Sequence, residues 1–213
     1  MSFFAYALAQ RSYLLEKIAE HALLTGVATL AAILIGVPVG ILIARRPSLR
    51  GVALGAAGIM QTIPSLAMLA LLMSLMRTMG WPPAVTALIL YALLPIIVNT
   101  LTGLRGVDPD ILEAADGLGM TASQKLWMVE LPLAAPVVIA GIRTAAVMTV
   151  GIATLSTFIG AGGLGELIWR GIQTPQNPRP LLLGVLTASL MALLLGGMIG
   201  IMERTLKRRL RQA

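Results

Sequence analysis

The sequence has no cysteine and a single histidine among its 213 residues. Without cysteine there is no disulfide and no thiolate ligand, and His21 alone excludes a metal site built from several histidines. Charged residues make up 12% of the chain, against about 25% in an average soluble domain. No G-x-x-x-x-G-K-[ST] phosphate-binding loop is present. We therefore expect no metal, no cofactor and no enzymatic activity in this chain itself.

Apolar residues dominate what is present, at 57% of the chain with a mean hydropathy of +0.89. This is the composition of a membrane protein. A helix needs ~20 apolar residues to cross the hydrocarbon layer. Five stretches are long enough, which predicts an all-α integral membrane protein with five transmembrane helices. The expected spans are about 23–44, 51–76, 83–104, 133–159 and 181–202.

The basic residues predict the orientation. Five spans place the two termini on opposite sides of the membrane. With the C-terminus inside, the inner segments hold ten Lys and Arg residues and the outer ones hold five, with Arg143 inside a span. The positive-inside bias favours this N-out, C-in arrangement. It also accounts for the net charge of +7 without a nucleic-acid partner. Residues 1–22 are then an external segment and residues 206–213 a basic cytoplasmic tail.

A short polar stretch, residues 108–132, separates the third and fourth spans and holds five of the nine acidic residues. Asp108 and Pro109 predict a helix start, because Asp accepts bonds from free N–H groups and Pro is tolerated at the first helical position. Gly117 and Gly119 predict its end. An acidic, capped helix kept between two spans indicates a surface presented to a soluble partner, with an ordinary interfacial loop as the alternative.

A second short helix is predicted directly after it. Thr121 and Gln124 have the spacing of a capping box. The residues that follow suit a helix at the membrane surface, with Trp127 at headgroup depth. We expect Pro132 to end this helix and to begin the fourth span.

The same stretch carries a motif. Glu113-Ala114-Ala115, Gly119 and Val129-x-Leu131-Pro132 resemble the EAA signature of ABC importer permeases, with Val129 in place of Ile. In that family the segment is a cytoplasmic coupling helix that docks on the nucleotide-binding subunit. The resemblance implies a small type I ABC importer fold over residues 23–205 and an ABC ATPase as partner. The implied ATPase-coupling residues are Glu113, Ala114, Ala115, Asp116, Gly117 and Gly119.

Further segments resemble the osmoprotectant branch of these permeases, which imports glycine betaine, choline, carnitine and related quaternary ammonium compounds. They are residues 61–67, 91–95, 99–100, 103–109, 140–145 and 159–165. The glycine-rich run is shared with methionine permeases, so an amino-acid permease is the alternative. The resemblance also implies the cytoplasmic (inner) membrane of a bacterium, contact with its lipids, a periplasmic or lipid-anchored solute-binding protein, and a second permease copy or a sister permease.

Polar residues and prolines inside the spans are candidates for the translocation path or its gate. Gln61, Pro64 and Ser65 lie in the second span, and Asn99 lies one turn after Pro95 in the third. A proline leaves the carbonyl one turn earlier without a partner, and that carbonyl can point into a cavity. Packing between helices is the alternative role for these residues.

Two further candidates belong to the fourth span and the loop after it. A charge such as Arg143 costs at least ~2.5 kcal/mol in a span, so it should face protein or water, as a gating contact or as a structural hydrogen bond. Gly160, Gly162 and Gly163 are too closely spaced for a helix interior. They predict a flexible external gate or docking loop, with a simple re-entrant connector as the alternative.

Two other classes of protein stay open. A membrane-embedded lipid headgroup transferase would use the acidic residues with a metal, but these lie at mixed helical angles and lack a basic phosphate-binding group. A passive channel or scaffold leaves the capped polar stretch unexplained.

Overall fold

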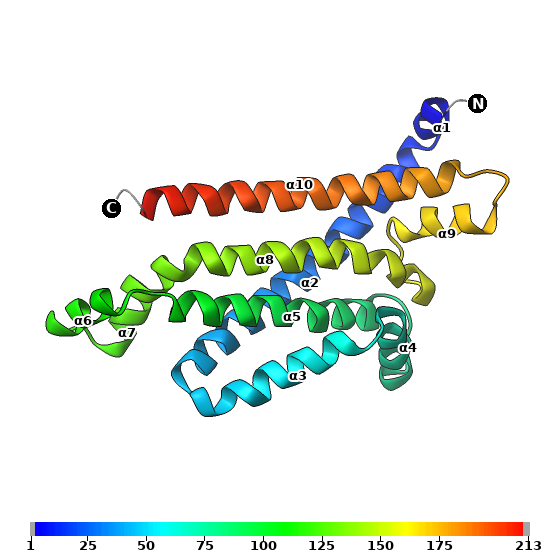
Figure 1. Cartoon of the computed structure of the whole chain (residues 1–213). Coiled ribbons are helices and arrows are strands. Elements are labelled where there is room, and N and C mark those ends of the chain that lie inside the picture. The colour runs from blue at the N-terminus through cyan, green and yellow to red at the C-terminus, as the bar shows by residue number, and fades with distance from the viewer. Residues whose placement is uncertain (1–2, 211–213) are drawn as a thin grey trace.

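The computed structural model describes residues 3–210, and in that range the chain forms helices and no strands. The predicted all-α fold is confirmed (Figure 1). The elements in chain order are α1 (Phe3–Ala9), α2 (Arg11–Arg45), the 3-10 turn η1 (Pro47–Leu49), α3 (Arg50–Thr62), α4 (Ser65–Met76), α5 (Trp81–Arg105), α6 (Pro109–Gly117), α7 (Ala122–Lys125), the π-helical turn η2 (Leu126–Glu130), α8 (Leu131–Ala153), the 3-10 turn η3 (Thr154–Ile159), α9 (Gly165–Gln173) and α10 (Arg179–Leu210).

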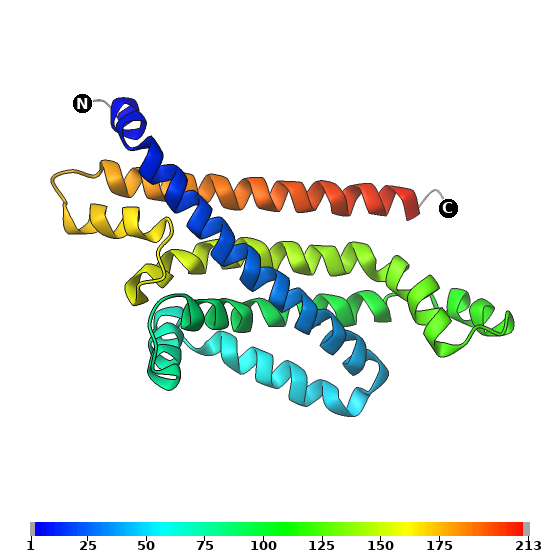
Figure 2. The same cartoon turned by 180° about the vertical axis from the view of Figure 1, so that it is seen from behind.

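Within residues 3–210, four helices are long and apolar enough to cross a membrane: α2, α5, the continuous helix Ala122–Ile159 and α10. Figures 1 and 2 show α5, α8 and α10 running side by side, with α2 crossing them diagonally. The helices extend beyond the predicted apolar runs. The predicted external segment 1–22 contains α1 and the start of α2, and residues 206–210 of the predicted tail continue α10. Residues 1–2 and 211–213 of those segments lie outside the described residues.

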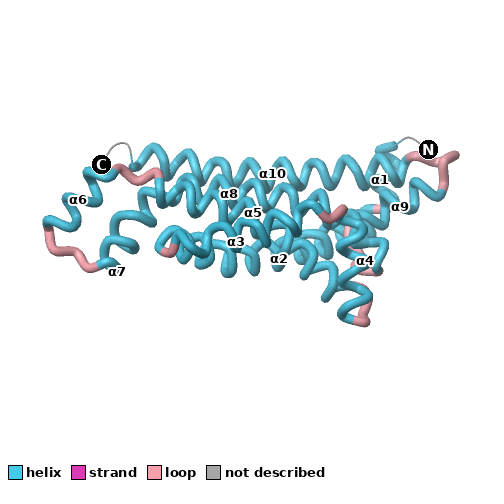
Figure 3. Tube along the Cα trace, turned by 60° about the horizontal axis from the view of Figure 1, so that its bottom comes forward, coloured by secondary structure: helices cyan, strands magenta, loops and turns pink. Residues whose placement is uncertain are grey.

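The second predicted span is not one helix. The chain leaves α3 at Ile63, which is extended (φ −72°, ψ 126°), and α4 starts at Ser65 after a bend of 103°. Pro64 is the physical reason, because proline lacks an N–H and pushes the residue before it out of the helical region. The prediction of five spans therefore holds only if this bent pair is taken as one span. Figure 3 shows α4 turned away from the direction of the long helices.

The prediction that Pro132 ends a separate surface helix is wrong. Helix α7 continues through η2 into α8, so the helix runs unbroken from Ala122 to Ile159. In η2 the N–H of Leu131 bonds the carbonyl of Leu126, five residues earlier. Such a π-helical turn absorbs the missing N–H of Pro132 without ending the helix.

The bundle has two distinct ends, which we name by their short helices. At the α6 end lie α6 and α7, and at the α9 end lie α1, α4 and α9 (Figures 1 and 2). Helices α2 and α5 approach each other closely because small residues face the contact. A Cβ on Gly40 would lie 2.5 Å from the Cβ of Thr100, and one on Gly36 would lie 2.8 Å from Ile96.

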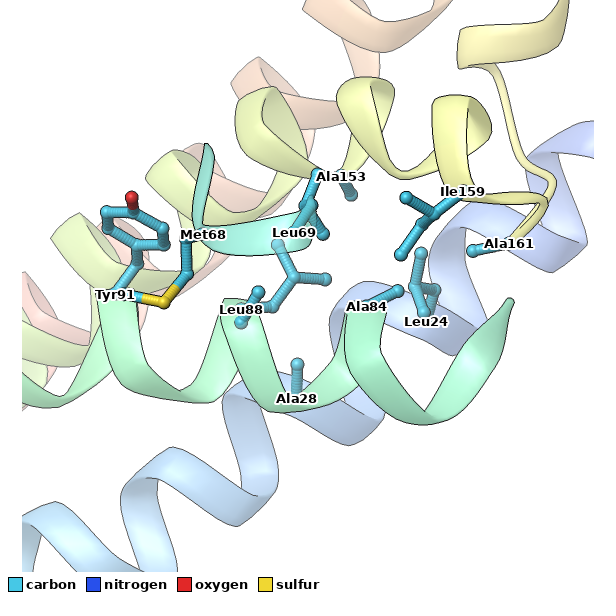
Figure 4. Packing of buried hydrophobic residues seen from close by; sticks show 11 residues of the cluster. Leu24, Ala28, Met68, Leu69, Ala84, Leu88, Tyr91, Ala153, Ile159 and Ala161 are labelled. Atoms are coloured by element: carbon cyan, nitrogen blue, oxygen red, sulfur yellow. The ribbon is translucent and has the colours of Figure 1, made fainter. Parts of the chain in front are cut away.

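A buried cluster near the α9 end joins α4 to the rest of the bundle. Figure 4 shows Leu69 of α4 beside Leu88 of α5, with Leu24 of α2 and Ile159 of η3 close by. All four side chains are at most 4% exposed. The position of α4 therefore depends on contacts with α2, α5 and η3 together.

Candidate functional site

Helix α6 has the caps that its sequence predicts. The Asp108 carboxylate accepts a hydrogen bond from the N–H of Asp110 at 3.0 Å, and Pro109 is the first helical residue. The helix ends at Gly117, and Gly119 then adopts a left-handed conformation (φ +74°). The N–H of Met120 turns back to the Ala115 carbonyl at 3.1 Å, which closes the helix end.

The predicted capping box is also present. The N–H of Thr121 donates to Oε1 of Gln124 at 2.8 Å, and the N–H of Gln124 donates to Oγ1 of Thr121 at 3.3 Å. Lys125 then ties α7 to α6, because its Nζ lies 2.6 and 2.7 Å from the two carboxylate oxygens of Asp116. Side chains from both helices thus define the angle between them.

The surface of α6 is open on one side. Of the six implied ATPase-coupling residues, Glu113, Ala114, Asp116, Gly117 and Gly119 are exposed, whereas Ala115 is only 4% exposed and packs inward. Sequence reasoning missed two apolar members of this surface, Leu118 at 82% exposure and Ile111 at 43%. A single exposed leucine at a helix end carries no signal in one sequence.

An ion pair fastens the α6 end to α2. Arg45, the last residue of α2, donates from Nη2 to Oε1 of Glu130 at 2.8 Å. The Glu130 side chain is only 8% exposed, so the pair is partly desolvated. Glu130 lies inside the recognised motif, between Val129 and Leu131, at a position that the motif leaves unspecified. This contact was not predicted.

The break between α3 and α4 forms one wall of a hollow. Gln61, Pro64 and Ser65, three of the predicted path residues, line it together. The opposite wall contains three residues that sequence reasoning did not assign to a path, Tyr91 of α5 and Met148 and Ile152 of α8. The structure therefore brings the candidates of the second span to one place.

Two hydrogen bonds hold the break. Pro95 has no N–H, so the Tyr91 carbonyl one turn earlier has no helical partner, as predicted. That carbonyl is not free, because Nε2 of Gln61 donates to it at 3.0 Å. In return the Tyr91 hydroxyl donates to the carbonyl of Ile63. The Gln61 side chain thus gives a partner to the carbonyl left free by Pro95, and the Tyr91 side chain gives one to the carbonyl of Ile63, next to Pro64.

Asn99 lies apart from the hollow, at the crossing of α5 and α8. Its Nδ2 donates to the Pro95 carbonyl at 2.8 Å. A Cβ on Gly141 of α8 would lie 2.4 Å from the Cβ of Asn99, so the two backbones approach closely here. This geometry matches the packing alternative for Asn99.

Arg143 lies partly exposed in a groove between α8 and α10, and its orientation toward protein or water stays a prediction. Its Nη1 lies 3.7 Å from Oε2 of Glu203, and the two side chains are 45% and 25% exposed. A Cβ on Gly200 would lie 3.2 Å from the same Nη1, so the glycine leaves room for the guanidinium. The groove is lined by Ala140, Thr144 and Glu203, and Gln61 is not part of it.

The glycine-rich loop is bonded to α2. Gly160, Gly162 and Gly163 have φ near +80°, which glycine adopts without strain. The N–H of Gly163 donates to Oε2 of Glu20 at 2.8 Å, and the N–H of Leu164 donates to Nδ1 of His21 at 3.3 Å. The glycines therefore form a defined turn against α2, and the predicted gate or docking role of the loop stays a prediction.

Long apolar helices, one of them broken, and a capped helical loop at one end make up this all-α fold. An inward-facing MetNI methionine ABC transporter shares this fold with a TM-score of 0.82 at 21% identity, over 93% of this chain and 98% of that one. An amino acid ABC transporter solved with histidines shares it with a TM-score of 0.76 at 20% identity, over 96% of this chain and 99% of that one.

The chain belongs to the family described as "Binding-protein-dependent transport system inner membrane component", which matches residues 36–212. It is similar to the carnitine transport permease OpuCD of Listeria monocytogenes (44% identity, 92% of this chain and 87% of the relative). It is also similar to the choline transport system permease OpuBB of Bacillus subtilis (41%; 91% and 88%) and to the osmoprotectant import permease OsmW of Salmonella typhimurium (44%; 89% and 90%).

The family defines what kind of component the chain is. It is a multi-pass inner-membrane transport subunit, and it is not an enzyme. Membership of the family implies a solute-binding protein and an ATPase as partners. The predicted class of protein and its membrane location are confirmed.

Proposed function

We propose that this chain is the permease of an ATP-driven importer for quaternary ammonium osmoprotectants such as glycine betaine, choline or carnitine. The observation that carries this proposal is the 41–44% identity, over about nine-tenths of the chain, to permeases named for carnitine, choline and osmoprotectants. An importer of another small solute, such as an amino acid, is the second candidate. It has the support of the shared fold alone, at 20–21% identity.

Helix α6 is the proposed contact with the ATPase. Its exposed face combines the charges of Glu113 and Asp116 with the apolar side chain of Leu118, and the Lys125–Asp116 pair holds it in place. Arg45–Glu130 connects the same end to α2. In the proposed N-out, C-in orientation the α6 end lies in the cytoplasm, where an ATPase is found.

The hollow at the helix break is the proposed part of the translocation path. It combines backbone that has left the helical ladder with the polar side chains of Gln61 and Ser65. Irregular backbone at membrane depth is tolerated where it lines a cavity. The hollow is open on one side, and a second permease, identical or related, would close it. Asn99 and Arg143 lie outside the hollow. Asn99 packs where α5 crosses α8, and Arg143 pairs with Glu203 between α8 and α10.

Transport in liposomes tests the proposal. The chain is reconstituted with its ATPase and binding protein, and uptake of labelled glycine betaine, choline, carnitine and methionine is compared with and without internal ATP. We expect ATP-dependent uptake of the quaternary ammonium compounds. ATP-dependent uptake of methionine in their place would favour the second candidate. Uptake without ATP through the chain alone would indicate a channel and would overturn both.

A further inference from the structure

His21 is a fully buried polar side chain that the proposed path does not use. It lies in α2 and is 0% exposed. Its Nδ1 accepts from the N–H of Leu164, at 3.3 Å, and its Nε2 donates to the carbonyl of Val150 in α8, at 3.0 Å. Because Nδ1 accepts and Nε2 donates, the ring is neutral with its proton on Nε2. One side chain thus joins α2, α8 and the glycine-rich loop.

The loop leaves no room for a different residue at this contact. A Cβ on Gly163 would lie 2.8 Å from Nδ1 of His21, and one on Gly162 would lie 2.5 Å from Oε2 of Glu20. Both glycines also have positive φ. The backbone of the loop is therefore fitted against two consecutive side chains of α2.

A network of charges surrounds this contact. Lys17 lies with its Nζ 2.9 Å from Glu20 and 3.1 Å from Glu166 of α9. Tyr13 donates to Glu166 at 2.8 Å and accepts from Arg170 at 3.1 Å. The network extends the attachment of α2 from the loop to α9.

The loop in turn contacts α4 and the turn that follows it. The N–H of Gly80, in the turn after α4, donates to the carbonyl of Ile159 at 2.6 Å. Ile159 and Ala161 pack in the cluster that contains Met68 and Leu69 of α4 (Figure 4). Since α4 begins at Ser65 beside the hollow, the loop joins α2 to the helix that borders the proposed path.

We propose that His21 and Glu20 are positioning residues that hold residues 160–164 as a latch on α4. With the latch in place, α4 keeps the hollow closed toward the α9 end. Release of the loop from α2 frees α4 to move and opens the hollow on that side. The inference rests on the proposed function, because it takes the hollow as part of the path.

Two substitutions at His21 separate its hydrogen bond to the loop, at Leu164, from its hydrogen bond to α8, at Val150. An asparagine places its amide oxygen near the position of Nδ1, so His21→Asn keeps an acceptor for Leu164. A glutamine amide nitrogen reaches the position of Nε2, so His21→Gln keeps the donor to Val150 and loses the acceptor for the loop. Both variants replace the same buried ring with an amide.

A thiol-labelling experiment reads the latch directly. The chain has no cysteine, so Ser65→Cys gives a unique probe beside the hollow. In the assembled transporter in liposomes, a membrane-impermeant maleimide is applied from the side of the α9 end, without nucleotide. We expect His21→Gln to raise the labelling rate roughly fivefold, as the loss of one hydrogen bond predicts. His21→Asn should label at the rate of Ser65→Cys alone.

Glu20 provides a second pair in case the buried ring is needed for folding. Its side chain is partly exposed, and Glu20→Gln retains an acceptor for Gly163 whereas Glu20→Ala removes it. Faster labelling in Glu20→Ala than in Glu20→Gln supports the latch. Equal labelling within both pairs overturns it.

The Ser65→Cys variant with native Glu20 and His21 tests the proposed path separately from the latch. If the Ser65→Cys variant alone shows the same labelling with and without ATP, the hollow does not open and close during transport, and the proposed path fails. If its labelling responds to ATP while both pairs give equal rates, the path stands and the latch alone is wrong.

Discussion

Gln61 and Tyr91 satisfy each other's helices: the Gln61 amide donates to the Tyr91 carbonyl at 3.0 Å, and the Tyr91 hydroxyl donates to the carbonyl of Ile63. Both carbonyls lie where a proline interrupts regular hydrogen bonding. The 103° bend between α3 and α4 is thus held by side chains of two neighbouring helices. Burying the polar groups of Gln61 and Tyr91 between apolar helices would cost free energy if they had no partner. Their hydrogen bonds to the backbone carbonyls offset that cost.

Removing one side of this pair should destabilise the bundle. In Gln61→Leu the Tyr91 carbonyl is left without a partner, at a cost of about 1–3 kcal/mol. We expect a lower thermal midpoint in detergent and reduced uptake. Thr86→Val is the control, because the Thr86 hydroxyl donates to the Pro82 carbonyl in its own helix and lies outside the hollow. Tyr91→Phe removes the second bond, to the Ile63 carbonyl, and should also lower the thermal midpoint. A midpoint equal to that of the control in both variants would contradict the role of these bonds.

A side chain at Gly119 should weaken the end of α6. Its φ of +74° makes Gly119→Ala strained by about 1 kcal/mol, although no neighbour lies within 4 Å of the added Cβ. Gly119→Asp adds a charge at the proposed ATPase contact. We expect weaker co-purification with the ATPase and loss of substrate-stimulated ATP hydrolysis. Gly197→Ala, in α10 with open space around it, is the matched control. If Gly119→Asp leaves assembly and uptake intact, the coupling assignment is wrong.

Breaking the Arg45–Glu130 pair should depend on which partner is removed. Arg45→Met leaves the nearly buried Glu130 carboxylate without its counter-ion, which costs more than removing both charges. We expect Arg45→Met to lower the thermal midpoint more than the double variant Arg45→Met/Glu130→Gln. Arg46→Met, next in sequence and exposed, is the control. Equal midpoints for the single and double variants would show that the pair is screened by water.

The crossing of α5 and α8 should tolerate no added methyl group at Gly141 without a loss of stability. In Gly141→Ala the new Cβ would lie 2.4 Å from the Cβ of Asn99 and 2.8 Å from the Pro95 carbonyl. Overpacking of this kind costs about 1–3 kcal/mol. Gly151→Ala lies on the same helix with nothing within 4 Å and should be neutral. Thermal unfolding followed by fluorescence measures both, and equal midpoints would contradict the close approach.

Features with a local cause could be predicted from the sequence. The Asp108 cap, the glycine end of α6 and the Thr121–Gln124 box depend on residues two or three positions apart, and all three are confirmed. The class of protein followed from the length of the apolar runs and from one spaced motif. Hydropathy reports how apolar a segment is, but it does not show whether its helix is straight, bent or continuous. The bend at Pro64 and the continuation through Pro132 were therefore missed.

Contacts between distant segments could not be predicted. Glu20 and Gly163 are 143 residues apart, and Arg45 and Glu130 are 85 apart. A lone glutamate or arginine near the end of an apolar run has many potential partners, and only the packing of the helices selects one. For the same reason Gln61 was assigned to a path without its bond to Tyr91.

Helix α2 carries both unpredicted attachments, Glu130 at its last residue and the glycine-rich loop near its start. The 25 positions from Glu20 to Arg45 span roughly 38 Å at ~1.5 Å per residue. When this segment, with Pro38 inside it, tilts as one body by about 5° around Arg45, its far end moves by about 3 Å. That displacement equals the length of the bonds from Glu20 and His21 to the loop, 2.8 and 3.3 Å. A small rotation imposed at the α6 end of the bundle is therefore sufficient to disengage the contacts of α2 with the glycine-rich loop.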